Sequence, residues 1–337
     1  MGGGRWRDGG EAPLRRRYAR RVRIGIVGSG VIGLSAVHEL ATAGHAVTVF
    51  DDRPLGARVS VLAAALWFPF EAYPLDRVEG WSARSYERFV ALAVEPGSGV
   101  RMAEGDILVR DPGTFDDSWR AWVPGIEPAE PSRLPGGVVA GFTARLPVIE
   151  MPVYLAWLEA RCRGLGVRFA AERVERLDAL DGVDAIVVAG GLESGRLLGG
   201  NALVHPVRGQ VVRLENPGLE RWLLDEQHPD GLTYVFPRSG DVVCGGTATR
   251  SDDLAWDAAT EAAILARARQ LVPELEGAAV RSRAVGLRPG RDEVRLEFVP
   301  DAGEVPVIAC YGHGGAGVTT SWGCAEEVAG MVEALRR

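Results

Sequence analysis

Three glycines near the start of the chain have the spacing of a nucleotide-binding turn. Gly28, Gly30 and Gly33 separate a short apolar run from a longer one. In such a turn the first glycine permits the tight bend, the second lets a pyrophosphate approach the backbone, and the third lets a helix pack closely on a strand. Two carboxylates, Asp51 and Asp52, follow about 20 residues later, where a ribose hydroxyl would be held. The pattern predicts a dinucleotide site, and the alternative is a glycine-rich turn with no ligand.

The elements that must position this turn follow from the apolar pattern on either side. Residues 24–28 are rich in Val and Ile, as is typical of a buried parallel strand, and residues 31–43 predict an apolar helix whose positive end can hold phosphates. Residues 46–50 predict a second strand. Residues 184–191 repeat the buried strand ending in glycines, and residues 305–319 lead from a strand through a glycine-rich loop into a final helix. The chain thus begins and ends in strand–glycine–helix units.

Between these units the chain changes character. Residues 206–215, 232–237 and 241–245 are β-rich and separated by turns, which indicates an antiparallel sheet. Further helices are predicted over 76–94, 151–163 and 258–271. The predicted fold class is α/β, with a discontinuous Rossmann-like nucleotide-binding domain and an antiparallel-β-rich substrate domain. The expected boundaries are 22–75, 150–205 and 285–337 for the nucleotide-binding domain, and 76–149 and 206–284 for the substrate domain.

Composition excludes several classes of function. The net charge of −7 argues against nonspecific nucleic-acid binding, which needs a basic surface. No apolar run approaches the roughly 18–20 residues of a membrane span. The four cysteines are dispersed without metal-site spacing, so we expect reduced thiols, no metal site and a cytoplasmic location. They are Cys162, Cys244, Cys310 and Cys324.

The first residues of the chain are rich in glycine and arginine. A twin-arginine export signal is one interpretation of the basic residues, but no separate apolar segment or small-residue cleavage site follows them. We therefore expect residues 1–21 to form a disordered extension.

Several motifs together make the chain resemble the D-amino acid oxidase family of flavoenzymes, particularly its bacterial members. The most specific is the segment 311–323, Tyr-Gly-His-Gly-Gly-Ala-Gly-Val-Thr-Thr-Ser-Trp-Gly, which matches the signature of the family. The resemblance extends over residues 22–334. The other matching segments are 28–33, 63–70, 208–210, 231–234 and 286–289.

The resemblance implies an oxidase that uses FAD, so the nucleotide-binding domain would be an FAD-binding domain. In this family the α-hydrogen of a D-amino acid passes as a hydride to flavin N5. The imino acid then hydrolyses to a 2-oxo acid and ammonia, and O₂ is reduced to H₂O₂. The implied partners are a small D-amino acid and O₂, and a homodimer is compatible with the family.

The resemblance also assigns the catalytic residues. The family positions that hold the substrate carboxylate match Arg288 and Tyr234, and a backbone carbonyl that accepts from the amine matches Gly315. The physics agrees, because an arginine fork fits a carboxylate and three points of attachment leave only one enantiomer correctly placed. The family uses no side chain as general base. From the residues alone, an ordinary surface arginine at Arg288 and a core or wall tyrosine at Tyr234 are favoured over catalytic roles, and only the resemblance assigns those roles. His313 is expected to bond backbone or cofactor.

The expected FAD contacts include one departure from the family. Its members usually carry consecutive hydroxyl residues and an aspartate before the Ala-Leu-Trp segment, whereas residues 58–62 here keep only the hydroxyl of Ser60 and add Arg58. Asp52 and Arg53 align with the ribose-contacting pair of the family, whereas general spacing favours Asp51. The expected contacts are Gly28, Gly30, Val31, Ile32, Gly33, Asp51, Asp52, Arg53, Ser60, Ala64, Ala65, Leu66, Val174, Gly190, Gly312, Gly314, Gly315, Gly317, Val318 and Thr319.

The expected substrate is a D-amino acid with a neutral side chain. Phe68, Phe70 and Ala316 offer apolar surface at or beside the pocket, where an unpaired charge is costly. A basic residue reaching this pocket would reverse the preference. The candidates from the β-rich domain are Arg208, Arg238, Arg250 and His228.

Other functions remain open at this point. A D-aspartate oxidase, or an oxidase of glycine or N-methyl amines, would use the same fold. An NAD-dependent dehydrogenase would account for the first glycine turn but would leave residues 184–191 and 312–317 unexplained. A nucleotide-binding module without activity would leave Tyr234 and Arg288 as coincidences.

Overall fold

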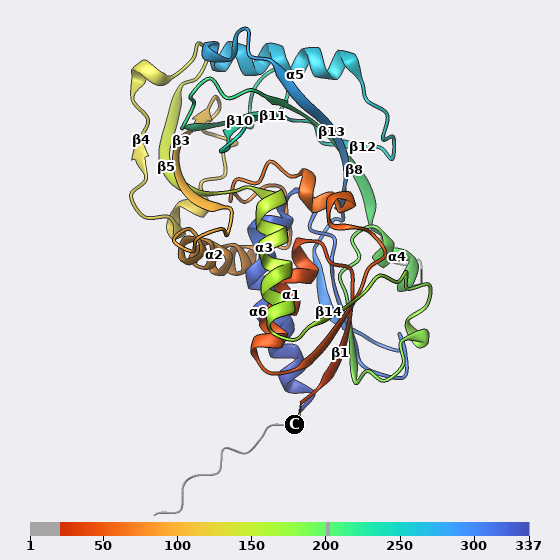
Figure 1. The fold of residues 1–337 in the computed structure, drawn as a ribbon. Helices are drawn as coiled ribbons and strands as arrows, with labels where there is room; N and C mark the ends of the chain where they lie inside the picture. Colours follow the sequence, from red (N-terminus) through yellow and green to blue (C-terminus); the bar gives the residue numbers. More distant parts are fainter. Residues whose placement is uncertain (1–20, 200–202, 337) are drawn as a thin grey trace, which may run out of the picture.

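The computed structural model describes residues 21–199 and 203–336, and its strands divide between two sheets (Figure 1). The mixed α/β architecture with two sheets confirms the predicted fold class. The extension expected over residues 1–21 lies outside the described residues except for Arg21. No helix in the described part of the chain is long and apolar enough to cross a membrane.

The first sheet has six strands in the order β14-β15-β7-β1-β2-β6. All neighbours are parallel except β14, which runs antiparallel to β15. Strand β1 lies inside this sheet, and Ile26 pairs with Val49 on one side and with Val187 on the other. The strands are β1 (Arg23–Val27), β2 (Ala46–Phe50), β6 (Arg168–Ala170), β7 (Ala185–Val188), β14 (Arg295–Val299) and β15 (Val307–Tyr311).

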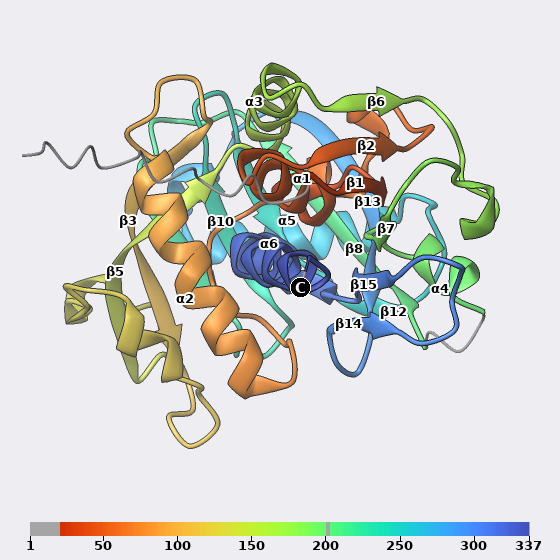
Figure 2. The same cartoon turned by 90° about the horizontal axis from the view of Figure 1, so that it is seen from below.

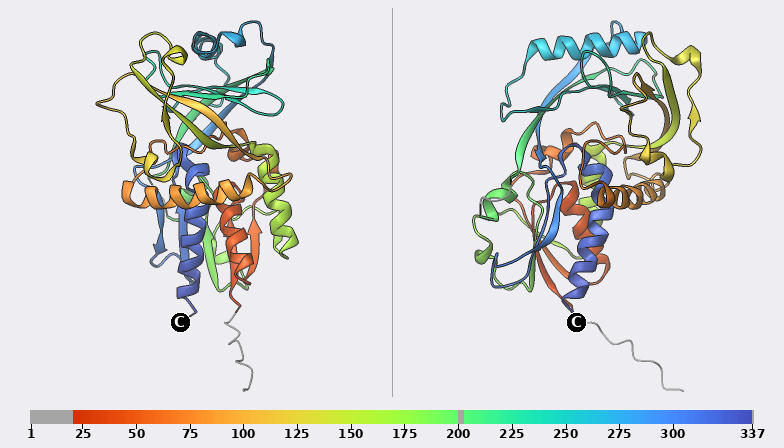
Figure 3. Two further views of the ribbon diagram at one scale, coloured as in Figure 1. Left: turned by 90° about the vertical axis from the view of Figure 1, so that its left-hand side faces the viewer. Right: turned by 180° about the vertical axis from the view of Figure 1, so that it is seen from behind.

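Helices cover both faces of this sheet. Figure 2 shows α1 and α6 together on one face and the short α4 on the other. Figure 3 shows α2 lying across α6. Gly323 permits this contact, because a Cβ on it would lie 2.3 Å from the Cα of Trp81. The helices are α1 (Val31–Thr42), α2 (Leu75–Leu92), α3 (Met151–Gly164), α4 (Glu193–Leu197), α5 (Ala258–Leu271) and α6 (Gly317–Ala334).

The second sheet has nine strands and is antiparallel except for the parallel pair of β3 and β9. Helix α5 covers its outer face (Figure 1), where Ile264 and Ala268 pack with Val235 in a separate apolar core. The strands are β3 (Val100–Val109), β4 (Glu127–Pro128), β5 (Ala140–Ile149), β8 (His205–Leu214), β9 (Trp222–Asp225), β10 (Thr233–Pro237), β11 (Val242–Gly245), β12 (Thr249–Arg250) and β13 (Val280–Gly290).

Short 3₁₀-helices occupy several connections. Two of them, η1 and η2, lie between the second strand and the Ala-Leu-Trp segment, and η7 leads directly into α6. They are η1 (Leu55–Ala57), η2 (Val59–Leu62), η3 (Ser118–Trp122), η4 (Pro131–Arg133), η5 (Leu177–Ala179), η6 (Pro273–Leu275) and η7 (Gly314–Ala316).

Most predicted elements are confirmed, and the strand over 46–50 and the helix over 258–271 have the predicted bounds. Four strands were not predicted: the two-residue strands β4 and β12, and the longer strands β9 and β14. Strand β14 is an edge strand with charged and exposed residues, so it lacks the apolar run of a buried strand. Strand β13 belongs to the second sheet as far as Gly290, beyond the domain boundary expected at residue 285.

Candidate active site

A cavity of about 290 Å³ lies at the carboxyl ends of β1, β7 and β15, where ligands bind in open parallel sheets. Strands β8 and β13 of the second sheet form the opposite wall. The cavity is lined by the first glycine turn, the segment after β7, the signature loop and residues of both sheets. Of the expected site residues it includes Gly30, Val31, Ile32, Arg53, Ser60, Ala64, Gly190, Tyr234, Arg288, Gly312, Gly314, Gly315, Gly317 and Val318.

The glycine turn has the geometry that a pyrophosphate requires. Gly28 has a φ of 99°, and a Cβ on it would lie 2.5 Å from the carbonyl oxygen of Ala189. A Cβ on Gly33 would lie 2.1 Å from the carbonyl oxygen of Gly28. At Gly30 a Cβ would meet only the hydroxyl of Ser60, at 3.1 Å, so the space beside this glycine is open to a ligand. The hydroxyl of Ser60 also accepts a hydrogen bond of 3.1 Å from the amide of Val31.

The two candidate ribose acids have different environments. Asp51 accepts from the amide and hydroxyl of Ser29 at 2.9 and 2.8 Å, and from Nε of Arg53 at 2.9 Å. Burial would raise the pKa of Asp51, but the hydrogen bonds from Arg53 and Ser29 outweigh it and lower that pKa. Asp52 is exposed. Both acids line a smaller hollow of about 140 Å³ that also includes Val174 and shares Arg53 with the larger cavity.

The segment that departs from the family places a buried cation at the cavity. Arg58 lines the cavity, and its Nη1 lies 2.8 Å from a carboxylate oxygen of Glu159 on α3. Its Nε is buried and has no hydrogen-bond partner among the described residues. A phosphate oxygen is an acceptor of the kind that such an unpaired N–H favours.

Arg288 and Tyr234 come from different strands of the second sheet and line the same cavity. Nη1 of Arg288 donates to the carbonyl of Thr247 at 2.9 Å. The ring of Tyr234 stacks on that of Phe236, with centroids 4.7 Å apart. Burial raises the pKa of Tyr234, and the nearby guanidinium of Arg288 only partly offsets this effect, so the phenol keeps its proton.

Glycines make room for these two side chains. A Cβ on Gly209 would lie 2.4 Å from Nη1 of Arg288, and a Cβ on Gly245 would lie 2.3 Å from Cζ of Tyr234. A Cβ on Gly246 would lie 2.6 Å from Cε1 of the same ring. The guanidinium and the phenol therefore lie flat against bare backbone. Sequence reasoning did not assign these roles, although a glycine inside a strand often marks such a close approach.

The signature loop forms the opposite side of the site. Gly312 has a φ of 87°, and the loop continues through η7 into the N-terminus of α6. A Cβ on Gly315 would lie 2.8 Å from Cδ1 of Phe70, so that ring covers the glycine. Gly317 and Val318, the first residues of α6, line the cavity, and a helix N-terminus favours negative charge on a ligand.

A second cavity, of about 730 Å³, borders this site at Thr247. Phe70 and Leu232 supply apolar walls, and Arg267 is the basic group in its lining. Burial raises the pKa of Glu226 in this cavity to about 8, and the neighbouring carboxylates of Glu71, Asp116 and Asp225 add to the shift. The acidic residues of the lining are Glu71, Glu79, Asp116, Glu226 and Asp230.

Some expected site residues are absent from the lining of the 290 Å³ cavity. Gly33 packs against the glycine turn itself, and the hydroxyl of Thr319 donates to the carbonyl of Phe68 at 2.8 Å. Ala65 and Leu66 bond to strand β5, through Ile149 and Val148. Gly28, Asp51, Asp52 and Val174 line the smaller hollow.

Four basic residues were candidates to reach the pocket and reverse the preference for neutral side chains. None of the four lines either of the two larger cavities. Arg208 donates to the carbonyls of Asp253 and Ala255, and Arg238 pairs with Asp241. His228 accepts from the amide of Asp230, and Arg250 is exposed on β12.

The chain is similar to known flavoenzymes over nearly its whole length. The family model described as FAD dependent oxidoreductase (DAO) matches residues 23–331. A D-amino-acid oxidase of Rubrobacter xylanophilus is 46% identical over 314 residues, which cover 92% of this chain and 95% of that protein. A D-amino-acid oxidase of Streptomyces coelicolor is 39% identical over 90% of this chain and 94% of its own length. A human D-aspartate oxidase is 34% identical over 92% and 94%.

Solved structures show the same fold. Glycine oxidase from Bacillus cereus superposes with a TM-score of 0.76 at 20% identity, covering 94% of this chain and 96% of that one. The open space at Gly30, the donors around it and the hollow beside Asp52 fit a dinucleotide, and the matching family model identifies it as FAD rather than NAD. The chain therefore belongs to the family of FAD dependent oxidoreductases.

Proposed function

We propose that this protein is a D-amino acid oxidase that prefers neutral side chains. The observation that carries the proposal is the placement of Arg288 and Tyr234 together on the wall of the cofactor cavity. Among the described residues, no carboxylate forms an ion pair with Arg288. A cation without an acidic partner beside a dinucleotide cavity is suited to bind a substrate carboxylate.

The chain offers three points of attachment to an amino acid. Arg288 donates two N–H groups to the carboxylate, and the protonated hydroxyl of Tyr234 donates a third hydrogen bond. The backbone carbonyl of Gly315 accepts from the α-amine. With carboxylate and amine fixed, the Cα–H faces the cofactor in only one enantiomer, so positioning supplies both rate and chirality.

The reaction removes one hydride, which is a proton with two electrons, from Cα of a substrate whose amine is deprotonated. FAD, when bound, would supply the acceptor for this hydride and the reductant for O₂, and the lone pair of the amine would form the C=N bond. Hydrolysis of the imino acid gives a 2-oxo acid and ammonia, and O₂ is reduced to H₂O₂. Among the residues of the chain, Arg288 and Tyr234 hold the substrate in place while the N–H groups at the start of α6 stabilise developing negative charge.

The charges around the site favour neutral over acidic side chains. The second cavity beside Arg288 carries more carboxylates than cations, and Glu226 already has a pKa of about 8 among them. The second carboxylate of D-aspartate would enter the same acidic surroundings, where a like charge is costly. The similarity to a human D-aspartate oxidase and the presence of Arg267 keep D-aspartate as the second candidate substrate.

Peroxide release across a panel of amino acids tests the proposal. We expect kcat/KM for D-alanine, D-valine and D-methionine to exceed that for D-aspartate, and no peroxide from the L-enantiomers. A tenfold or greater lead for D-aspartate would replace the proposal with a D-aspartate oxidase. Peroxide from glycine alone would favour a glycine oxidase, and no peroxide with any amino acid would contradict an oxidase.

A cytoplasmic location and a homodimeric state stay predictions. The support for the location is that all four cysteines are free and buried, as suits a reducing compartment. Fractionation of cells tests the location, and light scattering of the purified enzyme measures the mass of the assembly.

A further inference from the structure

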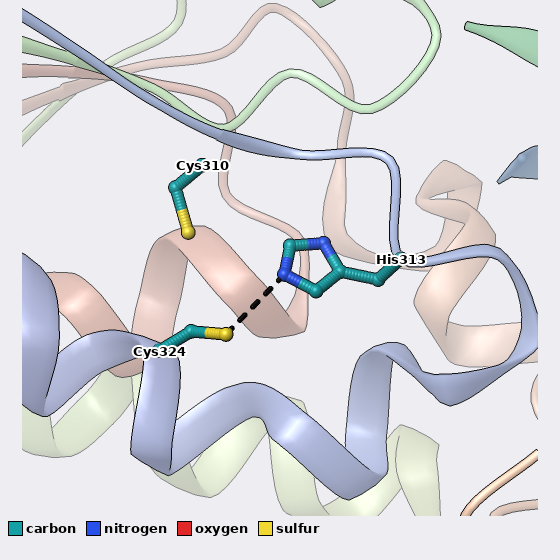
Figure 4. Close-up of side chains that lie close together, drawn as sticks. All are labelled: Cys310, His313 and Cys324. Carbon is teal, nitrogen blue, oxygen red and sulfur yellow. Dashed lines mark hydrogen bonds between the residues drawn. The ribbon is translucent and has the colours of Figure 1, made fainter. Parts of the chain in front are cut away.

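Three side chains that can ligate a metal converge beside the cofactor cavity. Cys310 lies on β15, His313 in the loop that follows, and Cys324 on α6 (Figure 4). Their solvent-exposed fractions are 1%, 3% and 0%. One ligand atom from each lies within 4.8 Å of the others, and Nε2 of His313 lies 3.5 Å from Sγ of Cys324.

This spacing agrees with a shared tetrahedral ion. Zinc binds sulfur at about 2.3 Å and imidazole nitrogen at about 2.0–2.1 Å, so two such ligands at a tetrahedral angle are about 3.5 Å apart. That is the distance observed between His313 and Cys324. Two thiols with one imidazole also form a soft ligand set, which selects zinc and related thiophilic ions over magnesium or calcium.

Charge and access favour the same interpretation. Two thiolates neutralise a divalent cation, so the loaded site carries no net charge into the core, whereas an isolated buried ion would be costly. Cys310 and His313 also line the cofactor cavity, which gives the ion an entry path and leaves a fourth coordination position on that side. No other Cys, His, Asp or Glu of the described residues joins the group.

We propose that Sγ of Cys310, Nε2 of His313 and Sγ of Cys324 form a binding site for one thiophilic divalent cation, such as Zn²⁺ or Cd²⁺. Each thiol gives up one proton on binding, and no electron is transferred. The ion would join β15 to α6 at the signature loop. Metal binding by these three side chains does not depend on which substrate the enzyme oxidises.

Cadmium is the probe that separates this site from surface binding. The FAD-loaded enzyme is equilibrated with Cd²⁺ and desalted, and retained metal is measured by elemental mass spectrometry. Thiolate-to-cadmium charge-transfer absorption in the ultraviolet is measured in parallel, because carboxylate or imidazole binding does not produce it. Cys310→Ser and Cys324→Ala each remove one ligand. Cys162→Ser and Cys244→Ser are matched controls, since each is a buried free cysteine outside the cluster.

We expect one retained equivalent with charge-transfer absorption in the wild type and in both controls, and loss of both signals in the two cluster variants. No retained metal in the wild type would overturn the proposal. Equal retention in all five proteins would overturn it as well, and so would peptide mapping that finds Cys310 and Cys324 joined in a disulfide. If a cluster variant does not fold, His313→Asn replaces it, with the same loss expected.

Discussion

Arg288 shows how single residues determine the chemistry of this site. Its guanidinium lies against Gly209, donates to the carbonyl of Thr247, and has no acidic partner among residues 21–199 and 203–336. Sequence reasoning reached Arg288 and Tyr234 only through the resemblance to a family. Nothing in their spacing brings them together, because they lie on different strands and meet through the pairing of the second sheet.

Arg288→Ala should lower kcat/KM on D-amino acids on the order of 10²-fold, because it removes the partner of the substrate carboxylate. This loss corresponds to about 3 kcal/mol of transition-state stabilisation. The flavin absorption spectrum should remain nearly unchanged. Arg250→Ala, which removes an exposed arginine from β12, is the control. Near-wild-type kinetics in Arg288→Ala would remove this residue from the site.

Gly209→Ala should also impair binding of the substrate carboxylate, although it removes no functional group. Its Cβ would lie 2.4 Å from Nη1 of Arg288, so the guanidinium must move. A displaced positioning group costs up to about 10²-fold in rate. Steady-state kinetics should show the loss in Gly209→Ala but not in Gly240→Ala, where a Cβ would meet no atom within 4 Å. Equal activity of the two variants would contradict the placement of Arg288.

Glu226 should make stability depend on pH. Its pKa is about 8 in the folded chain, against an ordinary value of 4.5, so the folded state holds a proton that the unfolded state has lost between these values. The favourable contribution of protonated Glu226 to the free energy of unfolding is complete below pH about 4.5. It is lost as the pH rises through about 8. Urea unfolding should therefore show Glu226→Gln gaining stability over wild type across this range and no further gain above it. The exposed Glu87→Gln should show no such trend, and a pH-independent difference for Glu226→Gln would contradict the shifted pKa.

At the scale of elements, sequence patterns predicted the turns, strands and helices whose form is set by residues close together in the chain. The turn between β1 and α1 has the predicted form because the positive φ of Gly28 and the close approach of Gly33 to Gly28 are set within the turn itself. The glycines that hold Tyr234 could not be assigned in advance, because their role depends on register: Tyr234 pairs directly with Gly245 only once β10 and β11 are aligned. Strand β9 is short, and its parallel partner β3 lies far away in the sequence, so no local pattern marks it.

Gly30→Val should abolish FAD binding, because its side chain would fill the space that a pyrophosphate needs beside the turn. The purified variant should lack flavin absorbance while keeping the circular dichroism of the wild type. Gly56→Val, in η1 where a Cβ meets nothing within 4 Å, should retain flavin. Stoichiometric flavin in folded Gly30→Val would show that the phosphates bind elsewhere.

At the scale of the whole molecule, a close helix contact packs α2 against α6. Gly323 lets α6 approach the backbone of Trp81, and a Cβ there would overlap it. The contact of Gly323 with Trp81 could not be predicted, because the two residues are far apart in the sequence and share no motif. Cys310, His313 and Cys324 are close in the sequence, but their side chains meet only because α6 packs back beside β15.

Gly323→Ala should therefore destabilise the protein by about 1–3 kcal/mol, as overpacked contacts do. Gly330→Ala lies on the same helix with no atom within 4 Å of its Cβ, and it should be neutral or slightly stabilising. Chemical denaturation of both variants measures the difference. Similar midpoints for the two would show that α2 and α6 can move apart without cost.

The wall of the cofactor cavity is assembled from residues as distant as Gly30 and Val318 and from both sheets. A ligand held by such a wall binds only the folded chain, so mass action shifts the folding equilibrium in its favour. At a free concentration 100 times the dissociation constant, the gain is about 2.7 kcal/mol. We therefore expect the cellular abundance of this enzyme to follow flavin supply, because chains made without enough FAD populate unfolded states that proteases remove.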